Sequence, residues 1–65
     1  METYRIKRGP YIESGFVEFV VLGKFNLDTG VTMVAYSEEI ITVGKLPKTY
    51  HILPEKIFKH ITKQL

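Results

Sequence analysis

A twelve-residue stretch of alternating side chains is the strongest constraint on the fold of this 65-residue chain. From Phe16 to Leu27 every odd position is apolar or glycine, whereas the even positions mix apolar, charged and amide side chains. Successive side chains of a β-strand point to opposite faces, so a period of two indicates a strand with one buried face. Because this stretch is long for one strand, Gly23 marks an expected bend or β-bulge. We expect one long curved strand, or two strands meeting near Gly23, whose odd positions form the core: Val17, Phe19, Val21, Phe25 and Leu27.

The rest of the chain carries further strand signals. Six Val, seven Ile and six Thr supply stiff, β-branched side chains that favour a pleated surface. Turn signals separate the alternating segments at Gly9-Pro10, at Asp28-Thr29-Gly30, at the charged corner Glu38-Glu39 and at Gly44. The pattern therefore predicts five strands, at residues 3–8, 16–27, 31–37, 40–43 and 49–53.

One helix is predicted at the C-terminal end, over residues 54–64. Pro54 suits a first helical position because its N–H is missing and its φ is fixed. Glu55 in the first turn and Lys63 in the last turn complement the helix dipole. An apolar stripe at spacings of one, three and four predicts the side that packs on the sheet: Ile57, Phe58, Ile61 and Leu65.

These elements predict a mainly β fold in a single domain, residues 1–65. Five short antiparallel strands followed by one C-terminal α-helix are typical of a small curled sheet, of the SH3-like barrel type, with the helix packed on it. A flat three-stranded sheet with one helix is the alternative. A chain of 65 residues is too short to divide into two domains.

The composition limits both the stability and the chemistry of the chain. It has no cysteine, which excludes a disulfide framework, a zinc–thiolate site and a cysteine nucleophile. Hydrophobic residues make up 45% of the chain, enough for a core. In so small a domain, however, hydrophobic burial and chain entropy nearly cancel. Because dense packing or self-association must supply the remaining stability, we expect a homo-oligomer.

Side chains suited to catalysis are few. His51 falls in the last predicted strand and His60 in the helix, and neither Ser14 nor Ser37 lies in a nucleophile elbow. The spacing of His51, Glu55 and His60 matches no metal-binding pattern. The five glycines are isolated and form no phosphate-binding loop. We therefore expect no catalytic residues, no cofactor and no metal, and keep an enzyme only as a remote alternative.

The net charge of +2 is unevenly distributed. Residues 1–8 carry three basic side chains against Glu2, residues 26–43 carry three acidic ones, and residues 45–65 carry five lysines against Glu55. Tyrosine can stack on bases while Arg and Lys contact phosphates. The candidates for binding a nucleic acid or a nucleotide are Tyr4, Arg5, Lys7, Arg8, Tyr11, Lys56, Lys59 and Lys63. An edge strand protected by its charges accounts for the same N-terminal pattern.

Large apolar side chains also occupy the second face of the long strand. Phe16, Val20 and Leu22 lie at even positions, beside the predicted core face. One sheet of a small barrel cannot bury both faces, so these three residues are candidates for an interface with a protein partner or with a second copy. Packing under the helix is the structural alternative.

Four segments combine into a pattern with a known counterpart: Val21-Leu22-Gly23-Lys24, Asp28-Thr29-Gly30, Met33-Val34-Ala35-Tyr36 and the run from Tyr50 to Phe58. The pattern resembles a family of uncharacterised short bacterial and phage domains that reads approximately V-L-G-x-A, E-T-G-E, M-V-V-Y and W-V-R-P-x-x-M-F. Leu53 stands where that family has Arg before the proline. The resemblance implies a small SH3-like β-barrel.

The cellular setting follows from what the chain lacks. Its start has no signal-peptide segment, and no apolar run approaches the roughly 18 residues of a membrane helix. We expect a cytoplasmic protein of a bacterium or phage, with no membrane partner.

The sequence as a whole favours a small non-enzymatic binding module that occludes or regulates a host protein. The alternative is a nucleic-acid or nucleotide binder that uses the basic, aromatic N-terminal strand and the C-terminal lysines.

Overall fold

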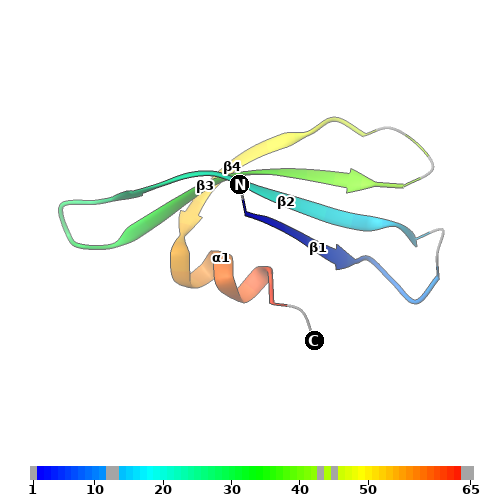
Figure 1. The fold of residues 1–65 in the computed structure, drawn as a ribbon, viewed down its shortest axis with the longest axis horizontal. Helices are drawn as coiled ribbons and strands as arrows, with labels where there is room; N and C mark the ends of the chain where they lie inside the picture. The colour runs from blue at the N-terminus through cyan, green and yellow to red at the C-terminus, as the bar shows by residue number, and fades with distance from the viewer. Residues whose placement is uncertain (1, 12–13, 43, 45, 64–65) are drawn as a thin grey trace.

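The computed structural model describes residues 2–11, 14–42, 44 and 46–63. In this part of the chain it contains strands β1 (Thr3–Lys7), β2 (Phe16–Asn26), β3 (Thr32–Ile41) and β4 (Thr49–Pro54), followed by helix α1 (Glu55–Ile61). The strands form one antiparallel sheet in the order β1-β2-β3-β4, so each strand pairs with its neighbour in the sequence (Figure 1). The predicted mainly β architecture with one C-terminal helix is confirmed.

The sheet differs from the expected five-stranded barrel in two respects. β3 continues through Glu38 and Glu39 to Ile41, so the predicted strands 31–37 and 40–43 form one strand and the predicted corner is wrong. Successive strand residues point to opposite faces, so two adjacent carboxylates can each reach solvent without a break in the strand. In addition, β1 and β4 are the two edges of the described sheet, which is therefore not closed. Val43, at the end of the predicted fourth strand, lies outside the described residues.

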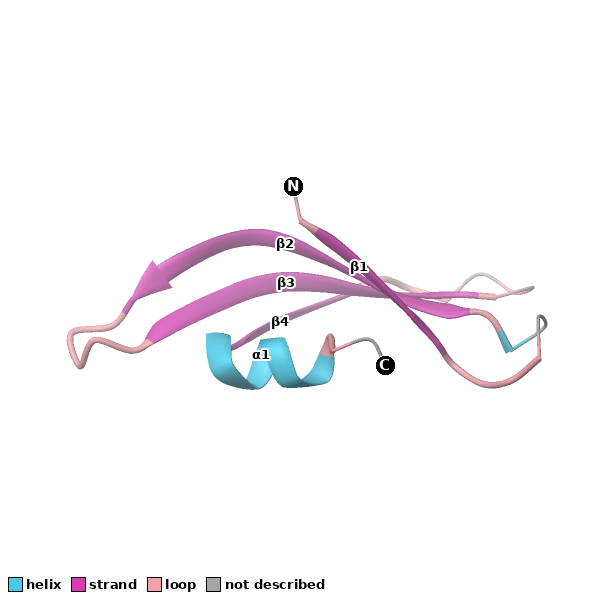
Figure 2. Ribbon diagram, turned by 60° about the horizontal axis from the view of Figure 1, so that its bottom comes forward, coloured by secondary structure: helices cyan, strands magenta, loops and turns pink. Residues whose placement is uncertain are grey.

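Helix α1 packs against one face of the sheet, which we call the helix-side face (Figure 2). Phe58 is the buried residue of the helix, and its ring centroid lies 4.8 Å from that of Tyr36, 5.8 Å from that of Tyr4 and 6.4 Å from that of Phe19. Such edge-on and tilted ring pairs add to the hydrophobic gain. The buried core consists of Phe19, Val21, Val34, Tyr36 and Phe58, with Tyr4, Ile6, Val17 and Leu53 packed against it.

The helix is shorter than predicted. Its backbone ends at Ile61, and the buried Thr62 closes it by donating from both N and Oγ1 to the carbonyl of Phe58, at 3.0 and 2.8 Å. The predicted apolar stripe is wrong at Ile57 and Ile61, which are 49% and 37% exposed. Of the seven residues of the helix only Phe58 is buried, so the flanks of the stripe are left in solvent. Gln64 and Leu65, which complete the predicted helix and its stripe, lie outside the described residues.

A β-bulge in β2 reverses the two faces of that strand. Val21 pairs with Tyr36 and Gly23 pairs with Ala35, so Leu22 is an extra residue on β2. The expected irregularity near Gly23 is therefore confirmed. Beyond the bulge, even positions point to the helix-side face, where Lys24 pairs with the fully buried Val34. The predicted core positions Phe25 and Leu27 are consequently wrong, because both side chains are exposed.

Candidate protein-binding surface

The face of the sheet opposite the helix, which we call the outer face, carries a cluster of large apolar side chains. The register places Met33 opposite Phe25, Ile52 opposite Ala35, and Tyr50 and Val20 on either side of Ser37. Leu22, the bulge residue, joins them because it lines one shallow depression together with Ala35, Tyr50 and Ile52. We name this cluster the outer patch and define it by seven residues: Val20, Leu22, Phe25, Met33, Ala35, Tyr50 and Ile52.

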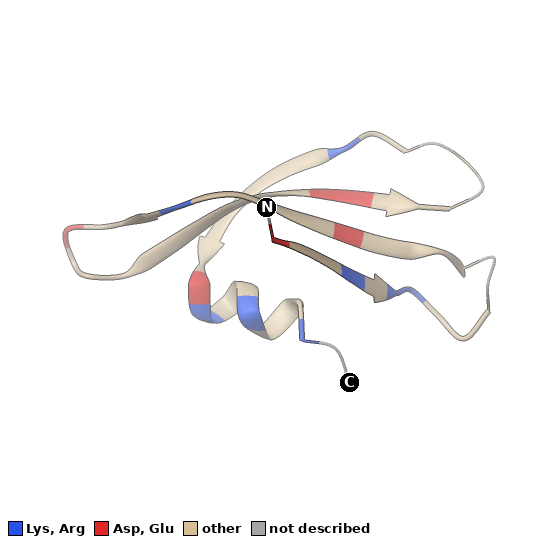
Figure 3. Ribbon diagram, viewed as in Figure 1, with Lys and Arg blue, Asp and Glu red and all other residues tan. Residues whose placement is uncertain are grey.

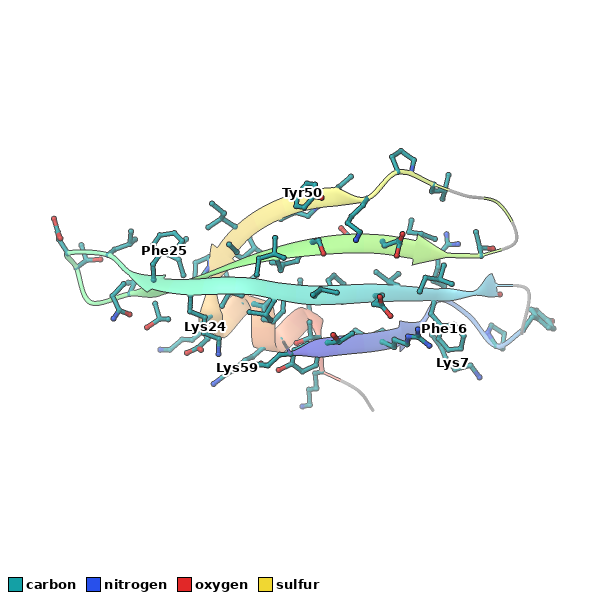
Figure 4. The ribbon with its side chains drawn as sticks, turned by 45° about the horizontal axis from the view of Figure 1, so that its top comes forward. Lys7, Phe16, Lys24, Phe25, Tyr50 and Lys59 are labelled. Carbon is teal, nitrogen blue, oxygen red and sulfur yellow. The ribbon has the colours of Figure 1, made fainter. Side chains whose placement is uncertain are left out.

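The outer patch is open to solvent. Tyr50 is 68% exposed, Ile52 57%, Leu22 53% and Phe25 45%, whereas the smaller or central members are half-buried. The depression at the centre of the patch has a volume of about 440 Å³. Figure 4 looks onto this face, with the helix behind the sheet, and shows Tyr50 on β4 and Phe25 near the end of β2. The patch is therefore a surface formed by β2, β3 and β4 together.

The predicted interface residues are only partly brought together. Val20 and Leu22 lie in the patch, and the Leu22 side chain is 53% exposed. Phe16 is on the same face but lies beyond Glu18, which is bonded to Arg5 and faces Glu39 across the β2–β3 ladder. A charged row thus separates Phe16 from the patch.

Sequence reasoning missed most of the patch. Alternation alone places Phe25 on the core face, because the bulge that reverses the two faces forms only in the folded strand. Tyr50 and Ile52 alternate along the last predicted strand, which was a usable signal of a second apolar face. Met33 and Ala35 alternate in the same way in β3. These signals become one surface only when the register aligns the three strands.

The predicted nucleic-acid-binding residues are divided among separate parts of the molecule (Figure 3). Tyr4 packs its ring against Phe58 on the helix-side face, and Tyr11 is exposed in the loop after β1. Arg5 Nε donates to Glu18 Oε2 at 2.7 Å on the outer face, which Lys7 shares. A further set, remote from the outer face, lies on or just after α1: Lys56, Lys59 and Lys63. Arg8 Nη1 donates to the carbonyl of Ser14 at 3.3 Å.

Ionic contacts fix the junction between the N-terminal segment, β2 and the helix. Lys24 Nζ lies 3.2 Å from Glu55 Oε2 and 3.4 Å from Glu2 Oε1, and the Tyr4 hydroxyl donates to Glu2 Oε2 at 2.5 Å. The hydrogen bonds from Tyr4 and Lys24 hold the pKa of Glu2 below its usual value. The hydrogen bonds to Glu55 and Glu2 raise the pKa of Lys24, and that to Glu2 raises the pKa of Tyr4. These contacts link the N-terminal segment and β2 to the first turn of the helix.

His51 takes part in a compact polar contact on the helix-side face. Its Nε2 lies 3.2 Å from Glu38 Oε2 and 2.9 Å from Thr49 Oγ1, and its ring stacks at a tilt against Tyr36, with centroids 5.4 Å apart. An acid–His–hydroxyl relay uses one ring nitrogen for the acid and the other for the hydroxyl. Here a single nitrogen makes both contacts, so the arrangement orients the ring and does not pass a proton from the hydroxyl to the acid.

The remaining candidates for chemistry are dispersed. His60 is exposed on α1, on a different element from His51. Among the described residues, no group of three or more His, Cys, Asp or Glu is placed to hold a metal ion. Of the helices in the described part of the chain, none is both long and apolar enough to cross a membrane.

Comparisons with known proteins give no further guide to this surface. The chain matches no protein-family model, and neither the curated proteins nor the solved structures contain a match to it. Its interpretation therefore depends on the geometry and chemistry of the outer patch.

Proposed function

We propose that this chain is a small non-enzymatic protein-binding module and that the outer patch is its binding surface. One observation carries the proposal: four large apolar side chains, each more than 40% exposed, lie together on a sheet face that no described element covers. Antiparallel sheets with one solvated face ordinarily place polar residues there. A contiguous exposed apolar patch is typical of a protein–protein contact.

The composition of the patch supports a protein partner. It combines an aromatic ring and a phenol with Met, Ile and Leu, and charged side chains lie only at its border. The centres of protein interfaces are enriched in aromatic residues and Met and depleted in charged residues. Binding here would cover a partner's surface without any chemical step, which agrees with the expected role of occluding or regulating a host protein.

A nucleic-acid or nucleotide partner is less well supported. That function needs basic and aromatic side chains on one surface, and here Arg5 and Lys7 lie on the outer face while Tyr4 lies on the helix-side face. The bacterial or phage origin, the cytoplasmic location and the resemblance to the short bacterial and phage domains stay predictions. The SH3-like type of the fold also stays a prediction, whereas the described sheet has four strands and is not closed.

Site-specific photo-crosslinking tests the proposal. A photoreactive amino acid replaces Tyr50 in the patch, and in a matched variant it replaces Ile57, an exposed apolar residue of α1 outside the patch. Irradiation in cells should join the Tyr50 variant to a protein, either another chain or a second copy of this one, and leave the Ile57 variant largely unlinked. Equal crosslinking at both positions, or none at Tyr50, would contradict the proposal.

A further inference from the structure

We infer that the occupant of the outer patch is a second copy of this chain, bound face to face about a two-fold axis. This inference rests on the proposed function, because it names the partner of the same surface. Three properties of the described structure support it: an excess of surface area, an incomplete layer arrangement, and the position of the charges around the patch.

The surface area is larger than a monomer of this mass requires. The accessible surface is 5094 Å² for a 7.5 kDa chain, whereas folded monomers of that mass expose about 4,250 Å². The excess, about 850 Å², is similar to the area that each partner buries in a protein–protein interface of standard size, about 800 Å². One copy seated on the patch would bring the exposed area per chain to the value expected for a stable domain.

The molecule is thin and extended for its length. The radius of gyration is 13.1 Å and the molecule measures 43 × 25 × 16 Å, whereas a compact chain of this length has a radius of gyration of about 11 Å. The thin dimension corresponds to one sheet with one helix beneath it (Figure 2). Stable domains bury the apolar face of each layer against another layer. A second sheet, stacked about 10 Å above the outer face, completes that arrangement.

The charges permit the patch to face its own copy. In a two-fold interface each residue meets residues of the same surface, so a charged patch would repel itself. The outer patch has no charged member, and the charged row of Arg5, Glu18 and Glu39 lies at one end of it, toward Phe16. A two-fold axis that lies in the interface plane, passes over Leu22 and Ile52 and runs across the strands carries the two charged rows to opposite ends of the dimer. Like charges are therefore kept apart.

The neutral patch also favours a second copy over a different protein. Complementary charges contribute to the choice of a partner and disfavour wrong ones. Here the rim, and not the centre, carries the charges, so the patch offers shape and apolar area alone. A second copy supplies a surface of the same size that also carries no charge.

Sedimentation and light scattering of the purified chain test the inference. Over concentrations from about 1 μM to about 1 mM, the range of weak to moderate affinities, the mass should rise to twice 7.5 kDa. Leu22→Glu should remain folded by circular dichroism and stay monomeric, because its charge would be buried at the axis. Tyr50→Lys, at a 68% exposed edge position, is a second disrupting variant that should fold. Ile57→Glu, outside the patch, should dimerise as the wild type does.

The outcomes separate the inference from the proposed function. A wild type that stays monomeric throughout, while the photoreactive Tyr50 variant joins to a different protein in cells, overturns the second copy and leaves the protein-binding surface intact. A monomer with no crosslink at Tyr50 overturns both. A dimer that survives Leu22→Glu and Tyr50→Lys but is lost in Ile57→Glu overturns the assignment to this face. In a dimer, the urea midpoint of the wild type should also rise with protein concentration, and that of Leu22→Glu should not.

Discussion

Lys24 Nζ lies 3.2 Å from Glu55 Oε2, so the segment of β2 beyond the bulge is tied to the first turn of α1. The contact exists because the extra residue Leu22 turns Lys24 toward the helix-side face, opposite the buried Val34. The same ammonium group lies 3.4 Å from Glu2 Oε1 and so reaches the residue that precedes β1. The bulge thus orients one lysine so that it links three parts of the chain that are far apart in sequence.

Removal of the Lys24 charge should weaken this junction. Lys24→Met keeps an apolar stem and leaves Glu2 and Glu55 without their shared cation, so we expect a lower urea midpoint at low ionic strength. The difference from the wild type should shrink in high salt, because exposed ion pairs are screened. Lys48→Met, which changes the net charge equally at an exposed loop position, is the control. Identical midpoints for the two variants would show that the Lys24 contacts contribute nothing.

The reversal of faces in β2 predicts opposite results for two phenylalanines. Phe19 is buried in the core, and Phe19→Ala should cost about 3–5 kcal/mol, which is close to the whole stability of a small domain. Phe25 lies on the outer face, so Phe25→Ala should leave the monomer folded. Any loss of stability should come from weaker self-association. Circular dichroism and urea titration at low concentration, where the chain is monomeric, distinguish the two cases. Equal losses would mean that the alternation continues unbroken through Gly23.

Two glycines with positive φ should respond differently to the same substitution. Gly15 has φ +75°, and a Cβ there would lie against the carbonyl oxygen of Ile41, a clash with backbone. Gly30 has φ +88° but open space around it, so Gly30→Ala carries only backbone strain, about 1–2 kcal/mol. We expect Gly15→Ala to be clearly the more destabilising in thermal unfolding, because the β2–β3 end must also shift. If the two variants unfold at the same temperature, the close approach of Gly15 to β3 does not persist in solution.

Stability should fall at high pH through two tyrosines, Tyr36 in the core and Tyr4 packed against it. Burial, reinforced by the nearby Glu38, raises the pKa of Tyr36 above 10.0, and the hydrogen bond to Glu2 raises that of Tyr4. A group whose pKa is higher in the folded state binds its proton more tightly there. Its contribution is therefore complete below the unfolded pKa and is lost as the pH rises through the folded pKa.

Urea unfolding between about pH 8 and pH 12, which spans the pKa of free tyrosine, measures this loss. The free energy of unfolding of the wild type should decrease above pH 10, the unshifted pKa of the phenol. In Tyr36→Phe the free energy of unfolding should decrease less steeply with pH, because the hydroxyl is gone and the ring still packs against Phe58. In Tyr4→Phe the decrease should also be less steep, because the variant lacks the hydroxyl whose hydrogen bond to Glu2 raises the pKa of Tyr4. An unchanged slope in both variants would contradict both the burial of the Tyr36 phenol and the hydrogen bond of the Tyr4 phenol to Glu2.

Much of the fold follows from local signals in the sequence. Strands at 3–8, 16–27 and 49–53 were expected, and β1, β2 and β4 begin at the expected residues. The helix was expected to begin at Pro54, and it begins one residue later, at Glu55, with Pro54 as the last residue of β4. The irregularity near Gly23 was also expected. These features depend on alternation, turn residues and caps within a few positions, which a sequence displays directly.

The candidate surface was less predictable than the fold. Val20 and Leu22 were identified because an apolar second face is visible in the alternation of β2, but Phe16 is separated from them by a charged row that only the register shows. Phe25 was assigned to the wrong face because a bulge changes the parity of every later residue in its strand. The helix gives a second example: the sequence places Ile57 in the apolar stripe, but packing on the sheet leaves its side chain exposed.

The sequence alone determined that this chain forms an antiparallel sheet with one terminal helix, because periodicity and turn chemistry act between neighbouring residues. The tertiary structure decided that Leu22 is the extra residue of the bulge, that Lys24 faces the helix, and that the sheet stays unclosed between β1 and β4. It also decided that apolar side chains from β2, β3 and β4 meet on one uncovered face. The physical reason is that register and layer packing are long-range properties, which arise only when separate segments compete for the same buried space.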